Sequence, residues 1–301
     1  MVACLNVSVS AQPIMATRSP SALPDLLHRV AQLVAEADAL VVSAGAGMGV
    51  DSGLPDFRGR EGFWRAYPAL AQARLDFDEV ASPDTFRRDP RLAWGFYGHR
   101  LQLYRATQPH DGFAVLANWV QRLGCGGFIF TSNVDGQFQR AGFEPARLYE
   151  CHGSIHWLQC LRPCSGAVWP ADDLRPEVDE RTCSWLGELP SCPHCGGLAR
   201  PNILMFDDWG WQGERYDQQA QMLGAWLGQA RRPLVIEIGA GLHIPSVRHF
   251  SESLCERLGA RLVRVNPQDA QVPKGQIGLA LGAAEALRAV DALLAQRPLH
   301  S

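Results

Sequence analysis

The stretch from Leu40 to Gly59, LVVSAGAGMGVDSGLPDFRG, constrains the fold of this chain more than any other. Strand-forming residues from Leu40 to Val42 run directly into a turn that contains Gly45 and Gly47. This layout is typical of a buried parallel strand followed by a tight turn and a helix. Glycines let backbone N–H groups approach a phosphate, and the helix dipole favours its negative charge. Because glycine turns also occur for purely geometric reasons, this stretch needs support from other signals.

Length, charge and hydropathy narrow the class of protein. With 301 residues, the chain can hold one large domain with an insertion, or two domains. The net charge of −3 argues against electrostatic capture of nucleic acid or of an anionic membrane. No apolar run approaches the roughly 18 residues of a membrane span. Residues 1–24 are rich in Ser, Ala and Pro and lack the features of a signal peptide, so we expect a disordered tail and a cytoplasmic protein.

Strand and helix patterns alternate through most of the chain. Apolar residues at helical spacing between Leu23 and Ala37 predict an amphipathic helix before the first strand. Further strands are expected at 127–131, 234–238 and 261–265, and further helices at 113–123, 246–258 and 282–295. This alternation predicts an α/β fold with a Rossmann-like, doubly wound parallel sheet. Ligands of such sheets bind at the carboxyl ends of the strands, where this chain has Gly45, Asn133, Asp135, Gly239, Gly241 and Asn266.

The aromatic-rich segment 61–104 interrupts this alternation. It is broken by Pro68, Pro83 and Pro90, and therefore predicts a helical insertion made of short helices. Its aromatic residues are expected to form a small core of their own.

The cysteines predict a metal site. Cys160 and Cys164 form one close pair, and Cys192 and Cys195 form another. Two such hairpins can direct four thiolates at one tetrahedral zinc ion, leaving no open position for a reacting water. We therefore expect one structural zinc per chain, in a small module over 158–199 that lacks a core of its own. Reduced core cysteines are the alternative, and Cys183 and His194 are not needed as ligands.

His152 is the candidate catalytic residue. Histidine moves protons near neutral pH, and this one lies between the second strand and the cysteine segment, followed by Gly153. His156, four residues later, is the second choice for the same role.

Together these motifs resemble the sirtuin family, the NAD-dependent protein-lysine deacylases. The specific ones are GAG…SGLPDFRG, TSNVD…RAG, and HGS just before the first cysteine pair, and the resemblance covers residues from about 25 to 290. It implies that His152 is the general base and that Asn133 lines the catalytic pocket. It implies that Phe57 shields the reactive ribose carbon on a mobile loop. The cofactor-binding residues that it implies are Gly45, Ala46, Gly47, Asp56, Phe57, Arg58, Trp64, Ser132, Asn133, Val134, Asp135, Gly239, Ala240, Gly241 and Asn266.

The chain also departs from the family pattern. Ser132 replaces the usual Gln, Gly49 replaces a Ser, and Gly239-Ala-Gly241 replaces a Gly-Thr/Ser-Ser turn. The substrate segment, with Leu204 and Phe206, usually ends in Phe-Gly-Glu, whereas this chain has Phe206-Asp207-Asp208-Trp209. That change alters the segment expected to dock the substrate peptide more than the NAD site.

Tyr97-Gly-His-Arg100 resembles the Tyr-x-x-Arg pair of the deacylase branch that accepts acidic acyl chains. A phenol and a guanidinium on one helical face can jointly hold a carboxylate. The alternative is that Arg100 is a solvated helix residue.

The resemblance implies an enzyme with a Rossmann-like domain over 25–60, 105–157 and 200–295. Its expected activity is removal of acetyl, or malonyl and succinyl, groups from acyl-lysine protein substrates. The products would be nicotinamide and O-acyl-ADP-ribose. NAD hydrolysis or ADP-ribosyl transfer on the same scaffold, and a catalytically silent NAD- or ADP-ribose-sensing module, are the alternatives.

Overall fold

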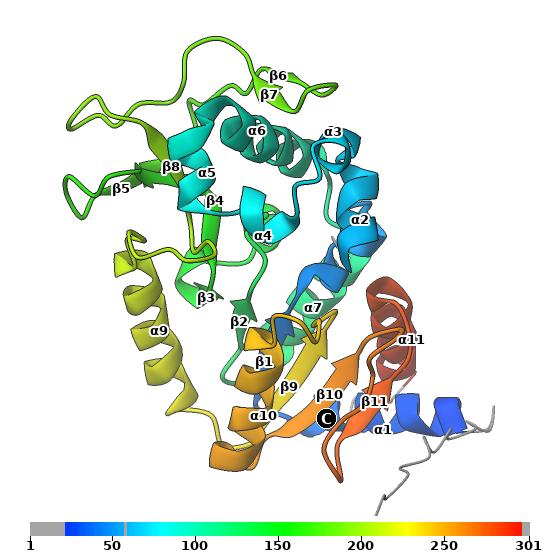
Figure 1. Ribbon diagram of the computed structural model, residues 1–301. Helices are drawn as coiled ribbons and strands as arrows, with labels where there is room; N and C mark the ends of the chain where they lie inside the picture. Colours follow the sequence, from blue (N-terminus) through cyan, green and yellow to red (C-terminus); the bar gives the residue numbers. More distant parts are fainter. Residues whose placement is uncertain (1–21, 57–58, 297–301) are drawn as a thin grey trace, which may run out of the picture.

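The computed structural model describes residues 22–56 and 59–296 (Figure 1). Most of the tail predicted over 1–24 lies outside these residues. Its last three residues already belong to helix α1 (Ala22–Glu36), so that boundary was wrong. Leu23 packs against the core, which extends the helix to include it.

The chain forms a larger and a smaller lobe. A six-stranded parallel sheet is the centre of the larger lobe, with the strand order β11-β10-β9-β1-β2-β3. The predicted doubly wound sheet is therefore confirmed. The two edge strands were not predicted, because three residues are too few to show a periodic pattern. The strands are β1 (Ala39–Ala44), β2 (Gly127–Thr131), β3 (Leu148–Glu150), β9 (Pro233–Ile238), β10 (Arg261–Val265) and β11 (Ile277–Leu279).

Helices cover both faces of this sheet (Figure 1). In β1, Leu40 and Val42 point to the core shared with α1, α7 (Asp111–Arg122) and α11 (Ala283–Ala295). Ala39 and Val41 alternate to the opposite face, where α9 (Glu214–Leu227) and α10 (Ser246–Leu258) pack. Helix α9 was not predicted.

The smaller lobe combines the aromatic-rich helices with the cysteine-bearing strands. Its hydrophobic residues form one shared core, so the helices and the cysteine segment support each other. For example, the indole Nε1 of Trp94 donates to the Ala199 carbonyl oxygen at 2.9 Å. The helices are α2 (Gly59–Ala66), α3 (Pro68–Gln72), α4 (Phe77–Val80), α5 (Pro83–Arg88) and α6 (Pro90–Ala106). The strands are β4 (Gly153–Cys160), β5 (Val168–Pro170), β6 (Val178–Asp179), β7 (Ser184–Trp185) and β8 (Ala199–Ile203).

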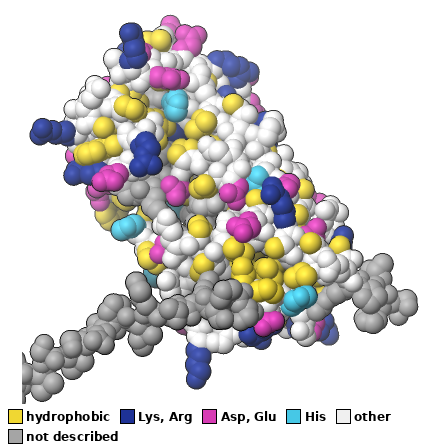
Figure 2. Space-filling model, turned by 90° about the vertical axis from the view of Figure 1, so that its right-hand side faces the viewer, with side chains coloured by type: hydrophobic (Ala, Val, Ile, Leu, Met, Phe, Trp, Pro, Cys, Tyr) yellow, Lys and Arg dark blue, Asp and Glu magenta, His cyan; other side chains and the backbone are white. Residues whose placement is uncertain are grey.

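Short helical turns complete the connections: η1 (Ala46–Met48) and η2 (Val50–Ser52) lie between β1 and α2, and α8 (Gln137–Arg140) and η3 (Pro145–Arg147) lie between β2 and β3. On the face seen from the side of α2 and α11, acidic and basic side chains are interspersed, and hydrophobic side chains gather in the lower half (Figure 2). None of the helices in the described ranges combines the length and apolar character that a bilayer crossing requires.

Candidate active site at the switch point of the sheet

The site is built around the glycine turn that follows β1. Strands β1 and β9 are neighbours although they are far apart in sequence, so the strand order changes direction between them. At this switch point the turn after β1 packs against the turn after β9. A Cβ atom on Gly45 would lie 2.7 Å from the carbonyl oxygen of Gly239. The absence of side chains therefore lets two backbone turns meet where α/β sheets bind their ligands.

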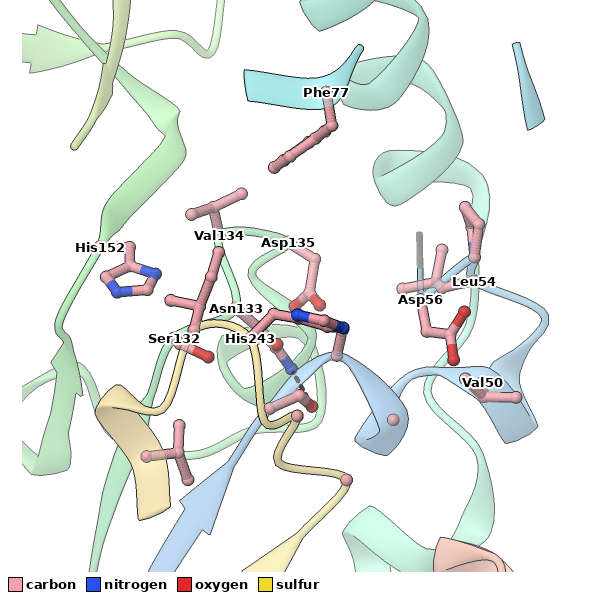
Figure 3. A pocket seen from close by; sticks show the side chains of 18 of the residues that line it. Val50, Leu54, Asp56, Phe77, Ser132, Asn133, Val134, Asp135, His152 and His243 are labelled. Atoms are coloured by element: carbon pink, nitrogen blue, oxygen red, sulfur yellow. Dashed lines mark hydrogen bonds between the residues drawn. The ribbon is translucent and has the colours of Figure 1, made fainter. Parts of the chain in front are cut away.

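A cavity of about 1200 Å³ opens above these turns, between the two lobes. It is larger than the roughly 300–1,000 Å³ of most small-molecule sites. Most of the predicted site residues line it: Gly45, Ala46, Gly47, Asp56, Tyr97, Arg100, Ser132, Asn133, Val134, Asp135, His152, Leu204, Phe206, Gly239, Gly241 and Asn266. In the close view, His152, Ser132 and Asn133 lie on one side of the cavity and Val50, Leu54 and Asp56 on the other (Figure 3).

Hydrogen bonds hold Asn133 against the glycine turn. Its backbone N–H donates to the Thr131 hydroxyl at 3.0 Å, and its side-chain Nδ2 donates to the carbonyl oxygen of Gly45 at 2.9 Å (Figure 3). Thr131 in turn donates to the Ala44 carbonyl oxygen. The ends of β1 and β2 are thereby held in one fixed geometry at the floor of the cavity.

Asp135 is a buried carboxyl group at the cavity wall. Its Oδ1 accepts a hydrogen bond from the backbone N–H of Gln137 at 2.8 Å. Burial nevertheless raises the pKa of Asp135 to about 6, because the charged form loses its hydration. A carboxyl group shifted this far beside a cavity is a mark of functional sites.

His152 lies in the turn between β3 and β4 and lines the cavity. Burial lowers the pKa of His152, so the neutral, basic form of the ring is favoured near neutral pH. Its Nε2 is 3.2 Å from the hydroxyl of Ser246, the first residue of α10, and the positive end of that helix also disfavours a protonated ring. The arrangement suits a general base.

His156, the second choice for the base, is differently placed. Its Nε2 lies 3.0 Å from the backbone carbonyl oxygen of Asp135, and its ring packs against Gly136. It does not line the cavity. The structure therefore supports a packing role for His156 and leaves His152 as the candidate.

Asn266 reaches the cavity at the end of β10, but its side chain is already bonded. Its Nδ2 donates to the Ala240 carbonyl oxygen at 3.0 Å, and its Oδ1 accepts from the backbone N–H groups of Gln268 and Asp269. These bonds hold the loop after β10 in place. A ribose contact by Asn266 would have to share these atoms.

Among the predicted cofactor residues that the structure describes, Trp64 and Ala240 do not line the cavity. Phe57 and Arg58 lie outside the described residues. The indole Nε1 of Trp64 donates to the Leu75 carbonyl oxygen at 2.8 Å. Ala240 is buried beneath the turn and contributes its carbonyl oxygen to the bond with Asn266.

Tyr97 and Arg100 both lie on α6, are buried, and line the cavity. The alternative of a solvated Arg100 is therefore wrong. Sequence reasoning missed Tyr104, whose hydroxyl accepts from Nε and Nη2 of Arg100 at 2.9 and 2.7 Å. Because Tyr104 is four residues after Arg100, the helical spacing offered a signal for this pair.

The altered segment after β8 keeps a compact turn. Asp207 has φ +52°, the left-handed conformation that Gly adopts readily and Asp tolerates better than most residues. Asp208 points inward, and its Oδ1 pairs with Nη2 of the buried Arg200 at 2.8 Å. The Phe206 N–H donates to the Ala81 carbonyl oxygen, which connects this segment to the end of α4.

The structure brings the four predicted cysteine ligands together. The Sγ atoms of Cys160 and Cys195 are 3.7 Å apart, those of Cys164 and Cys192 are 3.6 Å apart, and all four lie within 4.8 Å of one another. A tetrahedral ion with Zn–S bonds of about 2.3 Å requires sulfur separations of about 3.8 Å. The donor set therefore fits one zinc ion without Cys183 or His194.

Asp51 was also overlooked, although it lies inside the first motif. It lines the cavity, and its Oδ2 accepts from the backbone N–H of Ala284 at 2.7 Å, at the start of α11. This bond ties the glycine turn to the last helix.

The model of the Sir2 family matches residues 45–245, two thirds of the chain. This chain belongs to the Sir2 family. A protein of Aeropyrum pernix named NAD-dependent protein deacylase is 32% identical over 238 residues, covering 79% of this chain and 84% of that protein. NAD-dependent protein deacylase 2 of Pyrobaculum aerophilum is also 32% identical, covering 81% and 85%.

Solved structures give the same result for the fold. A Sir2 homolog–NAD complex has a TM-score of 0.67 at 24% identity, covering 88% of this Sir2 chain and 93% of that chain. The glycine turn, the His152 segment and the cysteine pairs thus belong to a Sir2 fold.

Proposed function

We propose that this Sir2 protein removes acyl groups from lysine side chains of proteins with consumption of NAD. The observation that carries the proposal is the cavity at the switch point. It brings the glycine turn around Gly45 and Gly47 into one cavity with Asn133, Asp135 and His152. NAD-dependent protein deacylase is also the name of relatives that cover most of the chain.

Bound NAD would supply the ribose carbon to which the acyl oxygen is transferred. Gly45, Ala46 and Gly47 would let its phosphates approach the backbone of the turn closely. The N–H groups of Gly45 and Gly47 already donate to the carbonyl oxygens of Ile238 and Gly239 at 2.9 and 3.1 Å, which fixes the turn against Gly239. Asn133 and Asp135 would orient the ribose and the nicotinamide. His152 would accept a proton from a ribose hydroxyl, and its lowered pKa keeps the ring able to do so near neutral pH.

The four thiolates of the cysteine cluster would hold one structural zinc. The ion would stabilise the paired strands β4 and β8. Leu204 and Phe206 follow β8, and their exposed side chains at the cavity would contact the acyl-lysine substrate. The need for reduced thiols supports a cytoplasmic location. The net charge of −3 supports partners other than nucleic acid.

For the acyl chain, we propose that Tyr97 and Arg100 bind the terminal carboxylate of a malonyl or succinyl group. Both groups line the cavity, and the bonds from Arg100 to Tyr104 orient the guanidinium. A pre-oriented guanidinium loses less entropy when it binds a carboxylate.

Incubation with NAD and a panel of acetyl-, malonyl-, succinyl- and long-chain acyl-lysine peptides tests the proposal, with products identified by mass spectrometry. We expect free lysine peptide, nicotinamide and O-acyl-ADP-ribose in equal amounts. Nicotinamide release without loss of the acyl group would show NAD hydrolysis or ADP-ribosyl transfer. Ligand binding without nicotinamide release would show a sensing module.

A further inference from the structure

The loop that joins β8 to α9 (Figure 1) carries two exposed side chains shortly after the residues that line the cavity. The indole of Trp209 is 99% exposed, although its neighbours Leu204 and Phe206 line the cavity. The carboxylate-bearing Asp207 is also exposed, two residues earlier in the same turn. An exposed aromatic side chain and an exposed carboxylate thus follow the cavity-lining Phe206 within three residues.

The backbone around Trp209 is held rigidly, in contrast to its side chain. The Asp208 carboxylate, itself fully buried, pairs with Arg200 and accepts from the backbone N–H of Gly210 at 3.1 Å. The side chain of Gln159 on β4 donates to the Gly210 carbonyl oxygen at 2.8 Å. Because the backbone is already fixed, binding would have to order only the side chain of Trp209 and not the loop that carries it.

We propose that Trp209 and Asp207 bind a lysine or arginine side chain that flanks the acylated lysine of a protein substrate. The cation would lie over the indole face, and the Asp207 carboxylate would complement its charge. Trp is the strongest cation–π partner among the side chains. The inference rests on the proposed function, because it names the kind of sequence around the acyl-lysine that this enzyme prefers.

The test compares two peptides that carry the same acyl-lysine, one with flanking arginines and one with glutamines at those positions. The wild-type protein should prefer the arginine peptide. Trp209→Ala should lower kcat/KM for that peptide about two- to fivefold through KM, which corresponds to about 0.5–1 kcal/mol. The glutamine peptide should be processed as before. Asp207→Asn should reduce the preference in the same direction, and Trp209→Phe should retain part of it.

Leu186→Ala, at a half-exposed position beside β7, is the matched control and should leave both peptides unaffected. Equal losses on both peptides, a fall in kcat alone, or no preference in the wild-type protein would overturn the inference. If the wild-type protein turns over no acyl-lysine peptide, the proposed function fails. Fluorescence-polarisation binding of the labelled arginine and glutamine peptides would then decide the role of Trp209 separately.

Discussion

Gly47 lies directly against Gly239 where the turns after β1 and β9 meet. A Cβ atom on Gly47 would lie 2.6 Å from the Cα of Gly239, and one on Gly239 would lie 2.4 Å from the Cα of Gly47. Real Cβ atoms do not approach backbone atoms this closely, so both turns depend on the missing side chains. Gly239 also has φ +64°, which L side chains rarely adopt.

We expect Gly47→Ala to lower the free energy of unfolding by about 1–3 kcal/mol, because the added methyl group overpacks the junction. It should also weaken NAD binding, since the turn must move. Gly224→Ala, in α9 with open space around it, is the control and should raise stability by about 0.5–1 kcal/mol. Urea unfolding and NAD calorimetry measure both effects. Unchanged stability in Gly47→Ala would contradict the tight contact.

Metal analysis should find one zinc ion per chain. Cys160→Ala or Cys192→Ala should abolish binding and lower the thermal midpoint strongly, because the ion's binding energy stabilises the folded module. Cys183→Ala should retain full zinc occupancy, since its thiol lies outside the four-sulfur cluster. Loss of zinc in that variant would show that a ligand was wrongly chosen.

His152→Ala should reduce acyl transfer about 100-fold or more, with NAD affinity nearly unchanged, because a base acts after the cofactor has bound. In the wild-type protein the acid limb of kcat/KM should titrate below the ordinary histidine pKa of about 6.5, since burial lowers the pKa of His152. His156→Ala should lower stability more than catalysis. If His156→Ala lost turnover and His152→Ala kept it, His156 would be the general base and His152 would have the packing role.

Arg100→Met should lower the efficiency on succinyl-lysine about 10- to 150-fold, the equivalent of a charge-assisted bond of roughly 1.5–3 kcal/mol. Activity of this variant on acetyl-lysine should change little or rise, because the buried guanidinium that faced the uncharged acetyl group is gone. Tyr104→Phe, which removes the oxygen that orients Arg100, should show a smaller loss with the same preference. Equal losses on both substrates would mean that Arg100 only supports the helix.

Asp135→Asn should stabilise the protein at pH 8 while lowering activity. The amide oxygen can still accept from Gln137, and the cost of a buried charge disappears. Because the folded-state pKa of Asp135 is raised from 3.8 to about 6, the wild-type protein loses stability as pH rises through this interval. The advantage of the variant should therefore be absent below pH 4, grow between pH 4 and 6, and reach about 1–3 kcal/mol above it. A pH-independent difference in unfolding free energy would argue against the raised pKa.

The sequence alone determined the central strands, the glycine turn and the cysteine ligands. These features depend on local signals: runs of β-branched residues that form buried strands, glycines at turn positions that no other residue can occupy, and thiols at the spacing of a metal hairpin. The structure agrees with these signals: Val42 lies between Ile129 and Ile236 in the sheet, and Cys160 lies beside Cys195.

Only the tertiary structure decided which of several equivalent residues face the cavity. Both His152 and His156 fit the sequence pattern, but His152 lies in the turn before β4 and lines the cavity, whereas His156 lies on β4 with its ring against Gly136. Trp64 and Trp209 have no periodic signal that tells one environment from the other, and packing leaves one half-buried and the other exposed. The shared core of helices and cysteine strands likewise depends on contacts between segments more than 80 residues apart, such as Gly95 with Cys183. Such contacts leave no local pattern, because the free energy that selects them comes from long-range burial.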